Sequence, residues 1–200
     1  MSRSIQTAST PRFGPAVGEP PPWIDPRRWG SLIGLLGGMV FIAGYSPPLG
    51  SATEITAWMI GLGLVGAALF AHYVRPVALG VLARPSPVAL AVYAACVVGE
   101  LALINIGSRA LAATSHSDLR PALIAAVVGL HFIPFAWAFG ERMFIWLGTL
   151  VAAVGTTGML IGYLGINHAA DAAAVTAGLT MQILILLYAQ GRFAHDTTAT

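Results

Sequence analysis

Apolar residues form six long runs along the chain, separated by short segments rich in proline, glycine and charged residues. A helix needs ~20 residues, at a rise of ~1.5 Å per residue, to cross the apolar core of a bilayer. Each run is about that long, and together they cover residues 28–46, 55–74, 87–107, 121–139, 142–164 and 168–190. The pattern predicts an all-α, polytopic membrane protein built as a six-transmembrane-helix bundle.

The segments outside these runs predict the domain organisation. Residues 1–27 contain six prolines and little apolar periodicity, so they cannot bury enough surface to fold alone. We expect a flexible, disordered, proline-rich cytoplasmic arm there, a six-helix transmembrane domain over residues 28–190, and a short cytoplasmic tail over 191–200.

The distribution of arginines predicts the orientation, because Lys and Arg are retained on the cytoplasmic side of short loops. The chain has no lysine. With a cytoplasmic N-terminus, eight arginines lie inside and two outside; the inner ones are Arg3, Arg12, Arg27, Arg28, Arg75, Arg84, Arg142 and Arg192, the outer ones Arg109 and Arg120. We therefore expect a multi-pass protein of the cell inner (plasma) membrane with both termini cytoplasmic.

Composition agrees with a membrane protein and excludes several other classes of protein. Hydrophobic residues make up 56% of the chain and charged residues 9%, against roughly 25% charged in soluble domains, so the expected solvent is the lipid bilayer. The net charge of +2 is divided between two sides of a membrane and favours no nucleic-acid partner. The absence of lysine excludes a retinal Schiff base, and no HExxH motif supplies a metal site. We expect no cofactor or metal, and an enzyme has no sequence support.

Glu100 is the one carboxylate placed well inside a predicted span. It stands seven residues from the outer end of the third run, hence ~10 Å deep. An acidic side chain at a helix centre costs ~3 kcal/mol to insert, so it should face the bundle interior and find a partner or stay protonated. Glu100 is therefore a candidate proton site; the alternative is a carboxyl group held neutral by an interhelical hydrogen bond.

His131 lies at a similar depth in the fourth run, ~15 Å from its start. Pro134 follows it, has no N–H and deprives the carbonyl of Leu130 of its usual donor. An imidazole beside such a carbonyl is a candidate site for a proton, a cation or a polar ligand. The alternative is a neutral histidine bonded to a neighbouring helix, beside a tolerated proline kink.

His168 and Asp171 open the sixth run one turn apart. An acidic side chain in a first helical turn interacts favourably with the positive end of the helix dipole, so a structural role in capping is expected. If the third and sixth spans touch, both side chains would also line an outer vestibule leading to Glu100.

Small residues predict where helices approach closely, since transmembrane helices associate through packing rather than the hydrophobic effect. The helix-packing candidates form GxxxG steps at Gly30, Gly34 and Gly38 in the first run and at Gly158 and Gly162 in the fifth. Packing within one bundle is the expected use, and the alternative is the seam of a homo-oligomer.

One local motif resembles a known group of proteins. The stretch GLHFIPFAW, from Gly129 to Trp137 and including His131 and Pro134, is followed after a short turn by Met143 and Phe144. It resembles the GxHFxPxAW pattern of small bacterial multi-pass membrane proteins of unassigned function. The resemblance implies a six-helix fold centred on His131 and Pro134 and implies no substrate.

Two functional hypotheses remain from the sequence. In the first, the protein binds or transports a small solute or proton through a polar centre at Glu100 and His131. In the second, it is a non-catalytic accessory or structural subunit, docked onto a larger membrane complex through its glycine stripes.

Overall fold

A computed structural model of the chain describes residues 19–79 and 86–194 and confirms the predicted all-α, six-helix membrane fold. Six helices in this part of the chain are long and apolar enough to cross a membrane. They are α1 (Pro26–Tyr45), α2 (Ser51–Leu69), α3 (Pro87–Ala113), α4 (Arg120–Phe139), α5 (Met143–Tyr163) and α6 (Ala169–Ala189). A π-helical turn, η2 (Phe70–Val74), extends α2, and short 3-10 turns, η1 (Pro47–Leu49) and η3 (Ser117–Leu119), precede α2 and α4.

Local sequence signals explain where several helices begin and end. Asp25 caps α1, accepting a hydrogen bond from the backbone N–H of Arg27, and Ser86 caps α3 in the same way. A proline follows each cap, where its missing N–H removes no helical bond. Gly140 ends α4 in the left-handed conformation. Helix α3 continues to Ala113, six residues beyond the predicted span, so it is long enough to reach past the apolar core.

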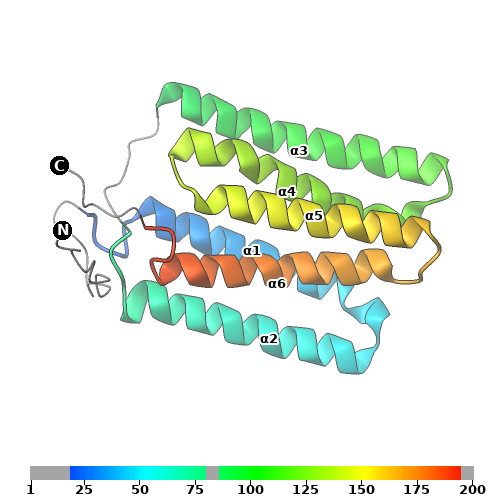
Figure 1. The fold of residues 1–200 in the computed structure, drawn as a ribbon, viewed down its shortest axis with the longest axis horizontal. Coiled ribbons are helices and arrows are strands. Elements are labelled where there is room, and N and C mark those ends of the chain that lie inside the picture. The colour runs from blue at the N-terminus through cyan, green and yellow to red at the C-terminus, as the bar shows by residue number, and fades with distance from the viewer. Residues whose placement is uncertain (1–18, 80–85, 195–200) are drawn as a thin grey trace, which may run out of the picture.

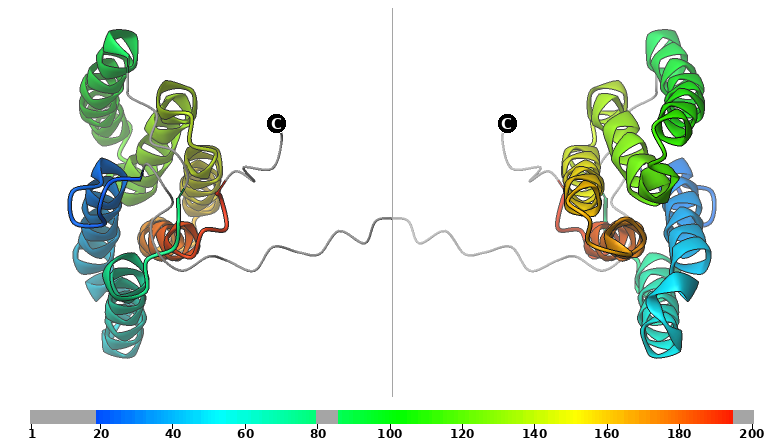
Figure 2. Two further views of the ribbon diagram at one scale, coloured as in Figure 1. Left: turned by 90° about the vertical axis from the view of Figure 1, so that its left-hand side faces the viewer. Right: turned by 90° about the vertical axis from the view of Figure 1, so that its right-hand side faces the viewer.

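The helices lie side by side with α3 and α2 at opposite edges (Figure 1). Helix α6 is the central element and packs on α1, α2, α4 and α5. Helices α4 and α5 form the largest interface, and α3 packs on α4 and on the turn η3. The end-on views in Figure 2 show the same order, with α3 outermost on one side. Most of the surface of α3 is therefore free for lipid or for another protein.

Close approach of α4 and α5 depends on glycine. A Cβ added at Gly129 would meet the backbone of Ala152, and one added at Gly155 would meet the backbone of Ala126. With no side chain between them, the two helices gain dispersion contacts along their length.

The predicted packing glycines divide into two groups. Gly38 of α1 lies against Gly178 of α6, where an added Cβ would stand only 2.8 Å from the Gly178 carbonyl oxygen. Gly34, Gly158 and Gly162 also face neighbouring side chains of the bundle. Gly30 differs, because a Cβ there would meet nothing within 4 Å.

The start of the transmembrane domain differs from the sequence expectation. The expected arm reaches residue 27, whereas α1 begins at Pro26, and Trp23 and Asp25 just before it contact other parts of the chain. Trp23 stacks on Tyr73, with ring centroids 4.5 Å apart, and its carbonyl accepts a hydrogen bond from the Trp29 indole. Aromatic stacking and the cap at Asp25 hold this stretch, which composition alone did not reveal. Residues 1–18 of the arm and 195–200 of the tail lie outside the described residues.

Helix α1 begins, and α6 ends, at the same end of the bundle (Figure 1). We call this the terminus end, and the opposite end, where α3 ends at Ala113 and α4 begins at Arg120, the far end.

Candidate functional site

The two titratable residues predicted at mid-span depth lie next to each other. Glu100 of α3 and His131 of α4 bring Oε2 and Nδ1 to 3.3 Å, within ion-pair distance. Helices α3 and α4 are consecutive and antiparallel, so residues at matching depths on their facing sides are brought together. Position along each helix sets the depth of each residue, and the α3–α4 hairpin supplies the contact.

The pair is mostly buried but incompletely bonded. The side chains of His131 and Glu100 are 12% and 19% exposed. The contact does not have hydrogen-bond geometry, and His131 Nδ1 has no hydrogen-bond partner in the described structure. Polar groups away from water are normally bonded, so an unsatisfied nitrogen beside a carboxylate marks a place where a proton or a ligand would be stabilised.

An aromatic cluster encloses the terminus side of the pair. The His131 ring lies 4.0 Å from that of Phe132 and 5.3 Å from that of Phe135, centroid to centroid. Phe135 is also within ring contact of three further aromatic residues, namely Tyr93, Phe139 and Phe144. These rings surround the imidazole with mainly apolar side chains on the terminus side of the pair.

Pro134 lies inside α4, which continues as helix to Phe139. The missing N–H leaves the Leu130 carbonyl without its helical donor, one residue from His131. Pro134 therefore leaves a backbone acceptor on the same turn of α4 as His131.

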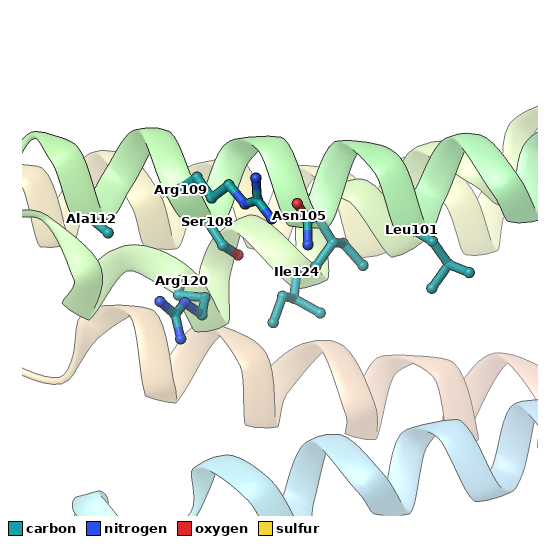
Figure 3. A pocket seen from close by; sticks show the side chains of 8 residues that line it. Leu101, Asn105, Ser108, Arg109, Ala112, Arg120 and Ile124 are labelled. Atoms are coloured by element: carbon teal, nitrogen blue, oxygen red, sulfur yellow. The ribbon is translucent and has the colours of Figure 1, made fainter.

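Towards the far end, the α3–α4 interface opens into a groove of about 550 Å³, which we call the α3–α4 groove (Figure 3). Its lining residues are Leu101, Ile104, Asn105, Ser108, Arg109 and Ala112 of α3 with Arg120 and Ile124 of α4. Leu101 follows Glu100 directly, and Ile124 is two turns from His131 on α4. The groove therefore starts near the Glu100–His131 pair and ends at the two arginines.

His168 and Asp171 lie in a different place. His168 occupies the N-cap position of α6, and its Nδ1 is 3.4 Å from Oδ2 of Asp171. Both line a separate depression of about 420 Å³ at the far end, together with Pro48 and residues of η3. Helix α3 packs mainly on α4, and the depression lined by Asp171 is separate from the Glu100–His131 pair on the α3–α4 interface.

A second polar constellation, at the terminus end, was missed by sequence reasoning. Arg28 is 2% exposed and donates hydrogen bonds to the carbonyls of His72 (2.7 Å) and Val77 (3.1 Å). Arg27 pairs with Asp25 at 2.9 Å and donates to the carbonyl of Leu79 at 3.3 Å. The arginines thereby donate hydrogen bonds to carbonyls at the end of η2 and in the segment after it. Carbonyls at and beyond a helix end lack helical N–H donors and need other partners.

The sequence contained a partial signal for this cluster. Asp25 followed by Pro26 is typical of a helix start. Arg27 and Arg28 follow directly in the first turn, close enough in sequence to contact the Asp25 carboxylate. The orientation argument places both arginines on the cytoplasmic side, and no sequence pattern links Arg28 to His72, 44 residues away.

The described residues contain no group of three or more His, Cys, Asp and Glu side chains able to hold a metal ion. Among the ion pairs of the described residues, Glu100–His131 is the one that joins two membrane-spanning helices at mid-span depth. It can exchange a proton or stabilise a cationic group. Comparisons with known proteins found no matching family model, no matching curated protein and no matching solved structure.

Proposed function

We propose that this protein binds or transports a proton or a small solute at the Glu100–His131 pair. The observation that carries the proposal is the 3.3 Å approach of Glu100 Oε2 to His131 Nδ1, from two helices, in the mid-span region. Intramembrane ionisable residues are costly to insert, so an adjacent acidic and basic group in this position favours a functional role.

Charge balance suggests how the site works. With one shared proton the pair is net neutral, either as two neutral groups or as a carboxylate beside an imidazolium. Loss of that proton leaves one uncompensated negative charge in a medium of low dielectric constant, which strongly favours recapture of a proton or binding of a cationic group. The pair therefore supports either proton exchange or recognition of a small cation.

Proton movement through purified, reconstituted protein tests the proposal. Liposomes containing the protein and a trapped pH-sensitive dye are exposed to a pH step with a potassium-valinomycin potential. We expect dye acidification with the unaltered chain and its loss with Glu100→Gln and with His131→Gln. Glu54→Gln, in the first turn of α2, serves as the matched carboxyl control. Equal proton flux in the unaltered chain, in both pair variants and in protein-free liposomes contradicts proton movement.

A small cation, rather than a proton, gives a different pattern. Flux of a labelled monovalent or organic cation, lost in Glu100→Gln, supports the solute form of the proposal in the absence of a pH signal.

The accessory-subunit hypothesis remains a second candidate because small residues face away from the bundle. A Cβ at Gly63 or Gly66 of α2 would meet nothing within 4 Å, and α2 lies at the edge opposite α3. Such a surface suits close docking of another helix, from a larger membrane complex or a second copy. Native mass spectrometry of the gently extracted protein distinguishes these states. A stoichiometric second polypeptide favours the complex, and a doubled mass favours a homo-oligomer. A bare monomer contradicts both.

We also propose an inner-membrane location with both termini cytoplasmic. The supports are the arginine asymmetry and the six candidate spans found among the described residues, an even number. Reporter fusions after residue 200 test it: green fluorescent protein should fluoresce there, and alkaline phosphatase should stay inactive. The reverse pattern contradicts this orientation.

A further inference from the structure

The α3–α4 groove has an ionic half and an apolar half, arranged along the membrane normal. Arg109 and Arg120 stand at its far end with Ser108 between them, and Leu101 stands at the opposite end (Figure 3). The lining residues of α3 extend from Leu101 to Ala112, which is ~16 Å along a helix at ~1.5 Å per residue. The groove thus runs from the far surface towards mid-span.

The two arginines are exposed and therefore accessible to a ligand. Neither Arg109 nor Arg120 forms an ion pair within the described part of the chain. No acidic side chain is found among the described residues that line the groove. Two guanidinium groups on facing helices present forked donors that match the oxygens of a phosphate group. The far end of the groove is therefore complementary to an anion.

The apolar half indicates that this anion carries a hydrocarbon chain. Leu101, Ile104 and Ile124 line the part nearer mid-span, with Asn105 beside them, so most of this part offers apolar contacts that a free inorganic anion does not use. Arg109 stands four residues before the end of the 27-residue α3, hence at headgroup depth. A phospholipid entering from the bilayer would place its phosphate at the arginines and its acyl chain along the three apolar side chains.

We propose that the α3–α4 groove is a selective binding site for one phospholipid with a negatively charged headgroup. The site depends on Arg109 and Arg120 and not on Glu100 or His131, so it stands independently of the proposed proton or solute function. It differs from general lipid solvation in requiring a headgroup charge and a groove of defined shape.

The test is lipid retention by the full-length protein in native mass spectrometry. Protein in detergent is titrated with phosphatidylglycerol or with phosphatidylcholine of the same chains. We expect preferential retention of phosphatidylglycerol, reduced about tenfold when Arg109→Gln and Arg120→Gln are combined, because each loses a charge-assisted bond. Arg142→Gln, an exposed arginine at the other end of the bundle, is the matched control and should retain the lipid normally.

A second variant tests the apolar half without altering charge. Ile104→Trp fills the part of the groove assigned to the acyl chain and should reduce phosphatidylglycerol retention while leaving the unfolding midpoint unchanged. Inorganic phosphate is titrated in parallel. Equal retention of both lipids, or undiminished retention in the double arginine variant, overturns the proposal. Phosphate binding that matches phosphatidylglycerol and survives Ile104→Trp also overturns it, in favour of a soluble anion.

Discussion

Arg28 of α1 donates a hydrogen bond of 2.7 Å to the carbonyl of His72, in the π-helical turn that ends α2. The same guanidinium reaches the carbonyl of Val77, and its Nε lies 4.0 Å from Asp25. One buried side chain therefore fixes the start of α1, the end of α2 and the segment that follows. This junction stabilises the terminus end, and π-helical turns of this kind are frequent at functional sites.

Removing the Arg28 guanidinium should destabilise the protein strongly. Arg28→Met leaves two carbonyls without their donors and weakens the charge balance at Asp25, so the free energy of unfolding should fall by ~3 kcal/mol. Unfolding in mixed detergent micelles, followed by tryptophan fluorescence, measures this. Arg142→Met, at an exposed position, should change it by less than ~0.5 kcal/mol. Equal effects of the two variants would show that the buried junction contributes little.

Gly129→Ala should separate α4 from α5. The new methyl group meets the backbone of Ala152, with its Cα only 2.6 Å away, and a backbone cannot move aside as a flexible side chain can. We expect a loss of about 2 kcal/mol in unfolding free energy. Gly63→Ala is the matched control, since open space surrounds that position. The unfolding free energy of the Gly63→Ala variant should be unchanged or higher by up to ~1 kcal/mol, because alanine favours helix over glycine.

The Gly63 control also bears on the accessory-subunit hypothesis. If Gly63→Ala is harmless in the purified protein yet lowers its abundance in native membranes, the outward face of α2 contacts a partner there. If the unaltered protein and the Gly63→Ala variant are equally abundant in native membranes, docking at this position is contradicted.

Phe135→Ala should damage the aromatic cluster beside His131. Phe135 is 4% exposed and contacts the rings of Tyr93 and His131, so its truncation leaves a cavity that lipid does not fill readily. We expect a loss of ~3 kcal/mol in unfolding free energy. Trp137→Ala, whose side chain is 72% exposed, should cost far less. The same micelle assay compares the two, and a larger effect at Trp137 contradicts the assignment of the cluster as core.

Gln182→Met should leave stability unchanged or raise it. Gln182 of α6 is fully buried beside Gly38 and Gly61, and neither its Oε1 nor its Nε2 has a hydrogen-bond partner in the described structure. Replacing an unsatisfied amide by an apolar side chain of similar shape removes a desolvation cost of ~1 kcal/mol or more. A lower thermal unfolding midpoint in Gln182→Met than in the unaltered protein would show that this amide is hydrogen-bonded in the membrane.

The sequence determined the features that each segment carries by itself. The lengths of the apolar runs defined six helices, since transfer of a helix into lipid depends on its own composition. Depth along each helix likewise placed Glu100 and His131 at similar levels, and the hairpin formed by consecutive spans brought them together. Helix ends were less well determined, as the extension of α3 to Ala113 shows, because polar residues at headgroup depth are compatible with either helix or loop.

Tertiary structure decided which helices meet. The separation of Asp171 from Glu100, the burial of Arg28 against His72 and the α3–α4 groove all depend on helix order in the bundle. All six helices present apolar surfaces to one another and to lipid, so the hydrophobic pattern does not distinguish one pairing from another. Pairing is instead selected by close packing at small residues, such as Gly129 against Ala152, and by buried polar contacts between residues distant in sequence. Those terms exist only once two particular surfaces are in contact, which is why the sequence pattern alone defined the helices and the folded bundle defined the sites.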